Sequence, residues 1–321
     1  MMKKFIFGVI GMGLVSATAV VSAFNQELEQ VNQDIVEQMK IENTVYQVGS
    51  LADANRFDAL EQLYAPEVLV DYESLSGEEP TLKSNTQLMT EWAGVLPGFD
   101  VTQHQISNVV VNVNGYRAHV QAQVIADHYV DDLFWQVKGN YHYTLVKDAQ
   151  DWKIAKHRFV LREEKGTRDV FAPAIQNARS KPNRYLIKAQ SKQTVVDFLE
   201  ALENKDMDKF ANVWAEDAVQ DMPFSPEGFP KRVVGKQNLL SHYKAWPEIS
   251  CENSDFTRNL VFYDMLDPET VLVEYDGSVD ILSTGKHYQQ RYAGLFHVID
   301  GKIELFREYY DPIIFKEAFD L

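Results

Sequence analysis

Apolar residues recur three and four positions apart in residues 194–204, TVVDFLEALEN, a spacing typical of a helix with one buried face. The apolar positions are Val195, Phe198, Leu199 and Leu202. A short acidic turn follows. The next apolar stretch predicts a second helix, which leads into a short strand ending at Asp221. The pattern therefore predicts two helices and a strand in close succession.

The same order of elements occurs earlier in the chain. Residues 44–71 align without gaps with residues 194–221, at a constant offset of 150 positions. Five aligned pairs are identical: Thr44 and Thr194, Val45 and Val195, Asp58 and Asp208, Ala65 and Ala215, and Asp71 and Asp221. Both copies continue with a loop, a third helix and a series of strands. The chain therefore contains two copies of one structural plan.

The strands follow the helices in both copies. In the first copy the segments are ISNVVVNVNG, YRAHVQAQVIADHYV, FWQVKGNYHYTLVK and WKIAKHRFVLRE; in the second they are RNLVFYDM, TVLVEYDGSVDIL, HYQQRYAGLFHVID and KIELFREYYD. Helices followed by antiparallel strands predict an α+β fold in which a curved sheet wraps a helix. We expect domains at residues 39–171 and 190–321, a linker at 172–189 and an N-terminal extension at 24–38.

The first residues have the pattern of a signal peptide. Lys3 and Lys4 precede an uncharged, largely apolar run that closes on small residues at positions 21–23. We expect cleavage after Ala23 and a periplasmic or secreted protein with no membrane contact after removal of residues 1–23. The alternative is a retained membrane anchor.

Charge and cysteine content exclude several classes of protein. The formal net charge is -16, and removal of Lys3 and Lys4 makes it -16 - 2 = -18, which disfavours nucleic acid and anionic membranes as partners. Cys251 is the only cysteine, so no disulfide forms within the chain. The sequence has no Gly-rich phosphate loop, no metal-type cluster of Cys and His and no G-x-S-x-G motif. We therefore expect no cofactor and no metal.

The first copy resembles scytalone dehydratase-like proteins of the SnoaL-like branch of the nuclear-transport-factor-2-like superfamily. The resemblance rests on LADANRFDALEQLYAPEVLVDYESL, VTQHQISN and GNYHYTLVKDAQDWKIAKHRF. It implies cone-shaped domains with an internal pocket, a pocket aspartate at Asp53 and a histidine at His104, with a second histidine at His128 if one residue is gapped. Ala52 stands where the dehydratase has an aromatic hydroxyl, which distinguishes this chain from that enzyme.

The second copy resembles the phenazine-biosynthesis A/B proteins. Its segments PFSPEGFPKRVVGK and LFREYYDP match the opening loop and the last strand of those domains. The resemblance implies that Glu308 is an acidic catalytic residue inside the pocket. Gly294 stands where those proteins have a strand histidine.

Strand parity indicates which side chains of the first copy face inward. His128 shares a face with the small or apolar residues Val120, Ala122, Val124 and Ala126, so we expect it inside the pocket. We expect Asp53 to pair with His128 as a general base, and His104 to polarise a carbonyl or remove a proton. The alternative is a structural histidine bonded to backbone. Asp71 and Tyr141 are further ligand-binding candidates, and we expect His119, His142 and His157 to be solvated.

In the second copy, three residues on one strand face are candidates for ligand binding: Tyr288, Gln290 and Tyr292. A carboxyl at Glu308 among aromatic rings should have a raised pKa and act as an acid, with Asp221 and Asp311 as rival carboxylates. The alternative for each is a surface acid. Three prolines, Pro223, Pro226 and Pro230, stiffen the loop after Asp221, so Phe224 and Phe229 would form an apolar lip over the cavity. The alternative is a loop that packs on the other domain.

Two functional hypotheses follow. One is a cofactor-free lyase or isomerase that acts by proton transfer on a small hydrophobic cyclic or carbonyl compound. The other is a protein that binds such a molecule without turnover. In both, we expect the two domains to face each other as the subunits of a dimer do, as an intrachain pseudo-dimer that could oligomerise further.

Overall fold

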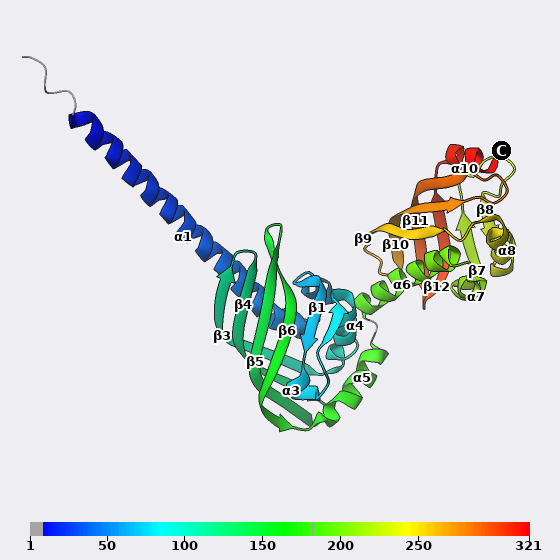
Figure 1. The fold of residues 1–321 in the computed structure, drawn as a ribbon. Coiled ribbons are helices and arrows are strands. Elements are labelled where there is room, and N and C mark those ends of the chain that lie inside the picture. The colour runs from blue at the N-terminus through cyan, green and yellow to red at the C-terminus, as the bar shows by residue number, and fades with distance from the viewer. Residues whose placement is uncertain (1–8, 182) are drawn as a thin grey trace, which may run out of the picture. The chain divides into compact units, whose positions relative to one another are not determined.

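The computed structural model describes residues 9–181 and 183–321, which form two compact units that divide after Lys181. The first unit begins with a long helix and continues with short helices and six strands (Figure 1). Its elements are α1 (Val9–Asp53), α2 (Phe57–Glu61), β1 (Tyr64–Asp71), α3 (Glu73–Ser76), β2 (Thr81–Ser84), α4 (Asn85–Ala93), η1 (Leu96–Gly98), β3 (Val101–Asn114), β4 (Arg117–Val130), β5 (Leu133–Asp148), β6 (Asp151–Gly166), η2 (Arg168–Val170) and α5 (Phe171–Ser180).

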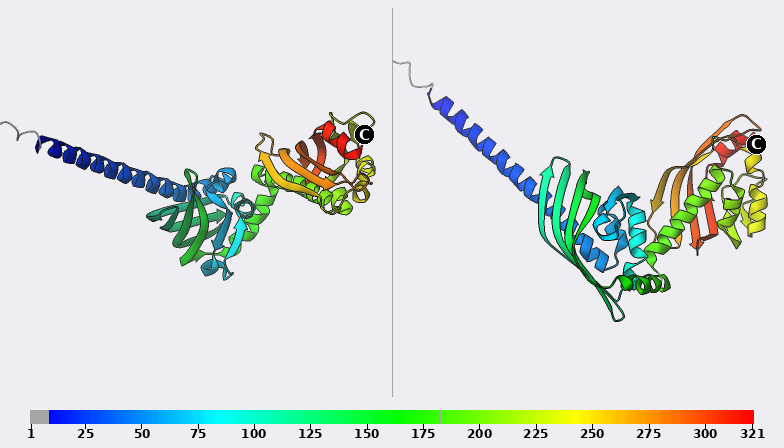
Figure 2. Two further views of the ribbon diagram at one scale, coloured as in Figure 1. Left: turned by 45° about the horizontal axis from the view of Figure 1, so that its top comes forward. Right: turned by 60° about the horizontal axis from the view of Figure 1, so that its bottom comes forward.

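The six strands of the first unit form one open, mixed sheet in the order β2-β1-β6-β5-β4-β3. Strands β1 and β6 are parallel, and the other neighbours are antiparallel. The sheet curves, and the C-terminal part of α1 lies in its concavity (Figure 2). The predicted α+β fold with a curved sheet around a helix is confirmed.

The core of the first unit lies between α1 and the inner face of the sheet. Ile41, Val45, Val48 and Ala52 of α1 are buried. Along β4, buried and exposed residues alternate from Arg117 to Val130, with Ala118, Val120, Ala122, Val124, Ala126 and His128 on the inner side. Ala126 of β4 and Ala52 of α1 line a cavity that remains between the helix and the sheet.

The second unit repeats this architecture. Its sheet has the order β8-β7-β12-β11-β10-β9, and β7 and β12 are its parallel pair. Its elements are α6 (Arg184–Glu203), α7 (Met207–Asn212), β7 (Trp214–Asp221), β8 (Arg232–Val234), α8 (Lys236–Tyr243), α9 (Trp246–Ile249), β9 (Asp255–Tyr263), β10 (Thr270–Asp280), β11 (His287–Ile299), β12 (Lys302–Tyr309) and α10 (Pro312–Phe319).

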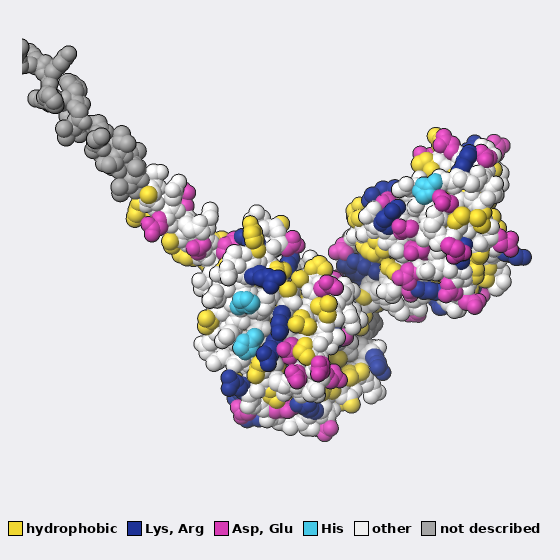
Figure 3. Space-filling model, in the orientation of Figure 1, with side chains coloured by type: hydrophobic (Ala, Val, Ile, Leu, Met, Phe, Trp, Pro, Cys, Tyr) yellow, Lys and Arg dark blue, Asp and Glu magenta, His cyan; other side chains and the backbone are white. Residues whose placement is uncertain are grey.

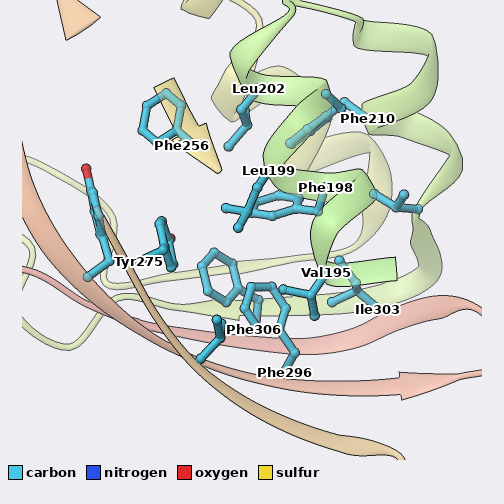
Figure 4. Packing of buried hydrophobic residues seen from close by; sticks show 14 of the residues in the cluster. Val195, Phe198, Leu199, Leu202, Phe210, Phe256, Tyr275, Phe296, Ile303 and Phe306 are labelled. Atoms are coloured by element: carbon cyan, nitrogen blue, oxygen red, sulfur yellow. The ribbon is translucent and has the colours of Figure 1, made fainter. Parts of the chain in front are cut away.

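The predicted apolar face of residues 194–204 packs on this second sheet. Val195, Phe198 and Leu199 of α6 are buried against Phe296 and Phe306, whose rings stack 4.1 Å apart (Figure 4). The helix interpretation of that segment is therefore confirmed.

The internal repeat extends to individual interactions. Arg158 on β6 pairs with Asp71 on the parallel strand β1 at 3.1 Å, and Arg307 on β12 pairs with Asp221 on β7 at 3.4 Å. Just before β1 the carbonyl of Leu63 accepts a hydrogen bond from the backbone of β6, and the carbonyl of Val213 does the same before β7. The repeated sequence thus specifies a repeated strand junction.

Two features differ from the pattern expected from sequence. The short edge strands β2 and β8 were absent from the expected elements. The predicted linker at residues 172–189 is largely helical: α5 belongs to the first unit and α6 to the second. Asn183 starts α6 by accepting two backbone hydrogen bonds at the helix N-terminus.

The N-terminal segment is only partly described. Residues 1–8, which include Lys3 and Lys4 of the predicted signal peptide, lie outside the described residues, and α1 runs without a break from Val9. None of the described helices is both long and apolar enough to cross a membrane. Figure 3 shows acidic side chains interspersed with basic ones on both units, and the acidic ones prevail in the formal net charge of -16.

Candidate functional site

The first domain contains a largely apolar cavity of about 140 Å³ between α1 and the sheet. The residues that matter for its chemistry are Ala52, Tyr72, Trp92, His104, His128 and Tyr141. An apolar cavity of about 150 Å³ holds one benzene molecule. The cavity of the first domain therefore suits a ligand of one small ring.

Asp53 and His104 form a hydrogen-bonded pair at the edge of this cavity. Asp53 is the last residue of α1, and His104 lies near the start of β3. The ring Nδ1 of His104 lies 2.7 Å from Oδ1 of Asp53, and the backbone N–H of His104 donates to Oδ2 at 2.7 Å. Burial opposes ionisation of Asp53, but the bonds from His104 hold the pKa of this carboxyl below its ordinary value.

The expected pairing of Asp53 with His128 is wrong, because Asp53 bonds His104 instead. His128 does face inward, as strand parity predicted, and is 5% exposed. Its ring lies 5.5 Å from the ring of His104 and packs between Phe99 and Trp135. Burial, and then the neighbouring His104, lower the pKa of His128 to about 3. His128 is therefore neutral near pH 7, and it is not the imidazolium that a carboxylate partner would stabilise.

His157 was expected to be solvated, and the structure contradicts this. Its side chain is fully buried, and Nδ1 lies 3.0 Å from the hydroxyl of Tyr64. The register of β6 against β5 shifts between Ile154 and Lys156, so Ile154 and His157 both face inward although they are three residues apart. Such a bulge breaks the two-residue period on which parity depends. His119 is exposed and His142 is partly exposed on the outer side of the sheet.

The second domain contains a larger cavity of about 300 Å³. Aromatic side chains form most of its wall, and Glu308 of β12 supplies a carboxyl group. Tyr288 and Tyr292 of β11, two of the candidate ligand-binding residues, also line the cavity. Gln290, on the same strand face, is buried beside it and bonds the hydroxyl of Tyr288 and the backbone N–H of Asp311.

Glu308 is a partly exposed carboxyl whose surroundings are almost entirely apolar or aromatic. Burial raises its pKa to about 7, against the opposing effect of a 3.2 Å hydrogen bond from Nε2 of Gln220. Nε2 of Gln220 also donates to the hydroxyl of Tyr243 at 2.7 Å. Glu308 can therefore gain or lose a proton near neutral pH, as a general acid or base requires.

The loop between β7 and β8 contributes one of its two phenylalanines to this cavity. Phe229 lines the cavity beside Pro230, and its ring lies 5.1 Å from that of Phe315. Phe224 is 56% exposed, packs against Tyr309 and does not line the cavity. The expected apolar lip therefore consists of Phe229 alone.

The three aspartates proposed as ligand-binding residues lie outside the cavity linings. Asp71 and Asp221 form the ion pairs of the strand junctions, and Asp221 also pairs with Arg232 at 3.3 Å. Asp311 caps α10 by accepting a hydrogen bond from the backbone N–H of Ile313 at 2.8 Å. These aspartates have structural partners.

Gly294 lies directly opposite Glu308 in the pairing of β11 with β12. A Cβ atom at this position would approach the ring of Phe296 to 2.7 Å and that of Phe306 to 3.2 Å. A larger side chain would thus displace the stacked rings. The second cavity therefore has no histidine opposite Glu308. Among the described residues, no group of three or more His, Cys, Asp or Glu side chains is arranged to hold a metal ion.

Comparison with known proteins identifies both halves. Two family models described as SnoaL-like domains match residues 33–158 and 195–306. The uncharacterised protein YesE of Bacillus subtilis is 35% identical over 40% of this chain and 85% of its own length. An uncharacterised PhzA/B-like protein of Pseudomonas aeruginosa is 26% identical over 40% of this chain and 89% of its own. The solved structure of a phenazine biosynthesis-related protein of Pseudomonas aeruginosa matches 43% of this chain and 90% of its own, at 22% identity and a TM-score of 0.37.

Proposed function

Because the chain belongs to the SnoaL-like family, with two domains of that family in tandem, we propose that its cavities bind small hydrophobic molecules and that the first domain is a cofactor-free lyase or isomerase. Its substrate would be a small cyclic or carbonyl compound that fits about 140 Å³. The reaction would be proton transfer, carried out by the side chains at the cavity edge.

The observation that carries this proposal is the pair of Asp53 and His104. With Nδ1–H donated to Asp53, the neutral ring of His104 keeps a lone pair on Nε2, the nitrogen on the opposite side from the carboxylate. An imidazole held in this way can take a proton from a carbon next to a carbonyl group. Asp53 then stabilises the imidazolium that forms, and it also keeps the ring in one tautomer.

The intermediate formed by loss of this proton can react further in two ways. After the C–H bond breaks, its electron pair forms an enolate with the carbonyl group. His104 can return the proton to another atom of the substrate, which gives an isomer. Alternatively it can give the proton to a departing hydroxyl group, which leaves as water and gives an unsaturated product. The two outcomes correspond to an isomerase and a dehydratase.

A hydroxyl group in the cavity wall is available to bind the carbonyl oxygen. Ala52 provides none, but Tyr72 and Tyr141 line the same cavity. Burial raises the pKa of Tyr141, so its hydroxyl stays protonated and can donate a hydrogen bond to an oxygen that gains negative charge. Neutral His128 offers a further polar group beside His104.

Binding without turnover is the second candidate function, and it is favoured for the second domain. That cavity holds Glu308 without a paired histidine, since Gly294 occupies the opposite position. The periplasmic or secreted location is also part of the proposal. N-terminal sequencing of the mature protein tests it: Phe24 as the first residue supports secretion, whereas an intact N-terminus contradicts it.

Deuterium exchange tests the proposed chemistry without knowledge of the natural substrate. Cyclohexanone is incubated with the full chain in D₂O, and loss of its α-hydrogens is followed by NMR. The wild-type protein should accelerate exchange over buffer, whereas His104→Gln should not, and the surface variant His119→Gln should behave as wild type. Equal exchange rates with wild type and His104→Gln would exclude His104 as the base.

A further inference from the structure

The second cavity combines one acid with a wall of aromatic rings. Of the 18 residues that line it, Glu308 is the only carboxylate, and neither lysine nor arginine is among them. Ten carry aromatic rings: Phe229, Tyr243, Trp246, Phe256, Tyr275, Tyr288, Tyr292, Tyr310, Phe315 and Phe319. From this combination we propose that the cavity of the second domain binds a small hydrophobic amine as its ammonium cation.

The aromatic wall suits a cation because ring faces are electron-rich. Tyr275 and Tyr292 stack with their ring centroids 4.9 Å apart, and Tyr310 lies 6.3 Å from Tyr292. The hydroxyls of Tyr288 and Tyr292 bond each other at 2.7 Å, and that of Tyr310 bonds Ser225 at 2.8 Å. These bonds fix the rings, so a ligand meets a preorganised wall.

Glu308 has no basic partner. Among the described residues it forms no ion pair, and its one hydrogen bond comes from the neutral amide of Gln220. The titratable groups around Glu308 are His242 on α8 and the hydroxyls of five lining tyrosines. These are Tyr243 on α8, Tyr275 on β10, Tyr288 and Tyr292 on β11, and Tyr310 after β12. Burial lowers the pKa of His242, although it keeps an exposed surface, so it adds no fixed positive charge.

A positively charged ligand would supply the counterion that Glu308 lacks. Burial gives Glu308 a pKa of about 7, and a cation beside it would favour the ionised form. A neutral ligand would instead leave the carboxylate without a counterion at pH values above 7. The uncompensated carboxyl therefore favours a cationic ligand, and cation binding near pH 7 should release a proton from Glu308.

The size of the cavity limits the amine. Its volume of about 300 Å³ is roughly twice that of an apolar cavity that holds benzene. A phenyl ring with a short alkylamine chain fits this space. The proposal concerns the second domain and does not depend on proton transfer in the first.

Isothermal titration calorimetry of the full chain with 2-phenylethylamine and its neutral counterpart 2-phenylethanol tests the proposal. The amine stays largely protonated up to about pH 9. At pH 8.5 it should bind at least about tenfold more tightly than 2-phenylethanol. Its affinity should fall about tenfold per pH unit below pH 7, because protonation removes the charge of Glu308. Titrations in two buffers of different ionisation enthalpy should show proton release near pH 7.

Two variants on β12 make the test specific. Glu308→Gln keeps the shape of the side chain and should abolish both the preference for the amine and the pH dependence. Glu304→Gln removes an exposed acid from the same strand and should leave both unchanged. Equal or tighter binding of 2-phenylethanol to the wild-type protein would overturn the proposal, and so would an amine preference that persists in Glu308→Gln. Undetectable binding of the amine would overturn it as well.

Discussion

Asp53 bonds His104 through both of its carboxylate oxygens, one to the ring Nδ1 and one to the backbone N–H, each at 2.7 Å. The backbone bond fixes the end of α1 to the start of β3, and the ring bond fixes the orientation of the imidazole. One residue therefore joins a helix to the sheet and also sets the direction in which a candidate base points.

The double hydrogen bond predicts a stability effect of Asp53→Asn that depends on pH. The Asn amide has one oxygen, so it can accept only one of the two hydrogen bonds that the carboxylate accepts. We therefore predict a loss of about 1–3 kcal/mol in the free energy of unfolding at pH 7. The folded-state pKa of Asp53 is lowered, so its contribution is present above the ordinary value of 3.8 and is lost as the pH falls below it.

Urea denaturation of wild type and Asp53→Asn at pH 7 and pH 3 measures this effect. Asp132→Asn, in the exposed turn between β4 and β5, is the matched control and should change stability little at either pH. A constant difference between wild type and Asp53→Asn at the two pH values would contradict the proposed role of the ionised carboxylate.

His128 should stay neutral across the physiological range. Burial lowers its pKa to about 3, so its ring NMR signals should not shift between pH 5 and pH 8. In Asp53→Asn the pKa of His128 should fall further, because the negative charge of Asp53 raises it in the wild type. Titration of His128 midway through this range would show that its site is more hydrated than the structure indicates.

The two buried histidines of the first sheet, His128 and His157, show where sequence reasoning succeeds and where it fails. His128 was placed correctly because β4 alternates regularly along its whole length. His157 was expected to be solvated but faces inward, because a bulge near Ala155 shifts the parity of β6, and no residue type in that segment indicates the bulge. The pairing of Asp53 with His104 joins residues 51 positions apart, and parity within one strand carries no information about such contacts.

Glu308→Gln should make the protein more stable at high pH. The folded-state pKa of about 7 lies above the ordinary value of 4.5, so the folded state holds a proton that the unfolded state has released. The stability from this group is full below pH 4.5 and is lost as the pH rises through 7. Thermal and urea unfolding at pH 8 should show a gain of up to about 3 kcal/mol for Glu308→Gln.

The same comparison at pH 4 should show no difference, because Glu308 is then protonated in both states. Glu304→Gln should have little effect at either pH, since that side chain is exposed. A destabilised Glu308→Gln protein at pH 8 would mean that the carboxylate has a favourable partner in the folded chain.

The two phenylalanines of the proline-rich loop should differ in their effect on ligand binding. Phe229→Ala removes a ring from the cavity wall and should weaken the binding of 2-phenylethylamine about two- to tenfold. Phe224→Ala removes an exposed ring outside the cavity and should leave the affinity unchanged. The calorimetric titration described above measures both, and equal losses in the two variants would contradict this assignment of the lip.

This loop also shows the limit of composition as a guide. Its prolines stiffen a segment that forms neither helix nor strand, and the next strand along the chain is β8, at the edge of the sheet. Composition could not distinguish Phe224 from Phe229, because the turn at residues 222–231 decides which ring faces the cavity. Glu308 was placed in the cavity by the family resemblance, and neither its bond to Gln220 nor the aromatic wall around it follows from the spacing of residues.

The tautomer of the His104 ring decides whether this side chain can act as the proposed base. Two-bond ¹H–¹⁵N correlation spectra of the full chain distinguish a proton on Nδ1 from one on Nε2. Because Nδ1 bonds a carboxylate oxygen of Asp53, we predict a single ring proton on Nδ1 and an unprotonated Nε2; in Asp53→Asn this preference should weaken. A ring that carries its proton on Nε2 in the wild-type protein would have no lone pair to offer the cavity, and would contradict the assignment of His104 as the base.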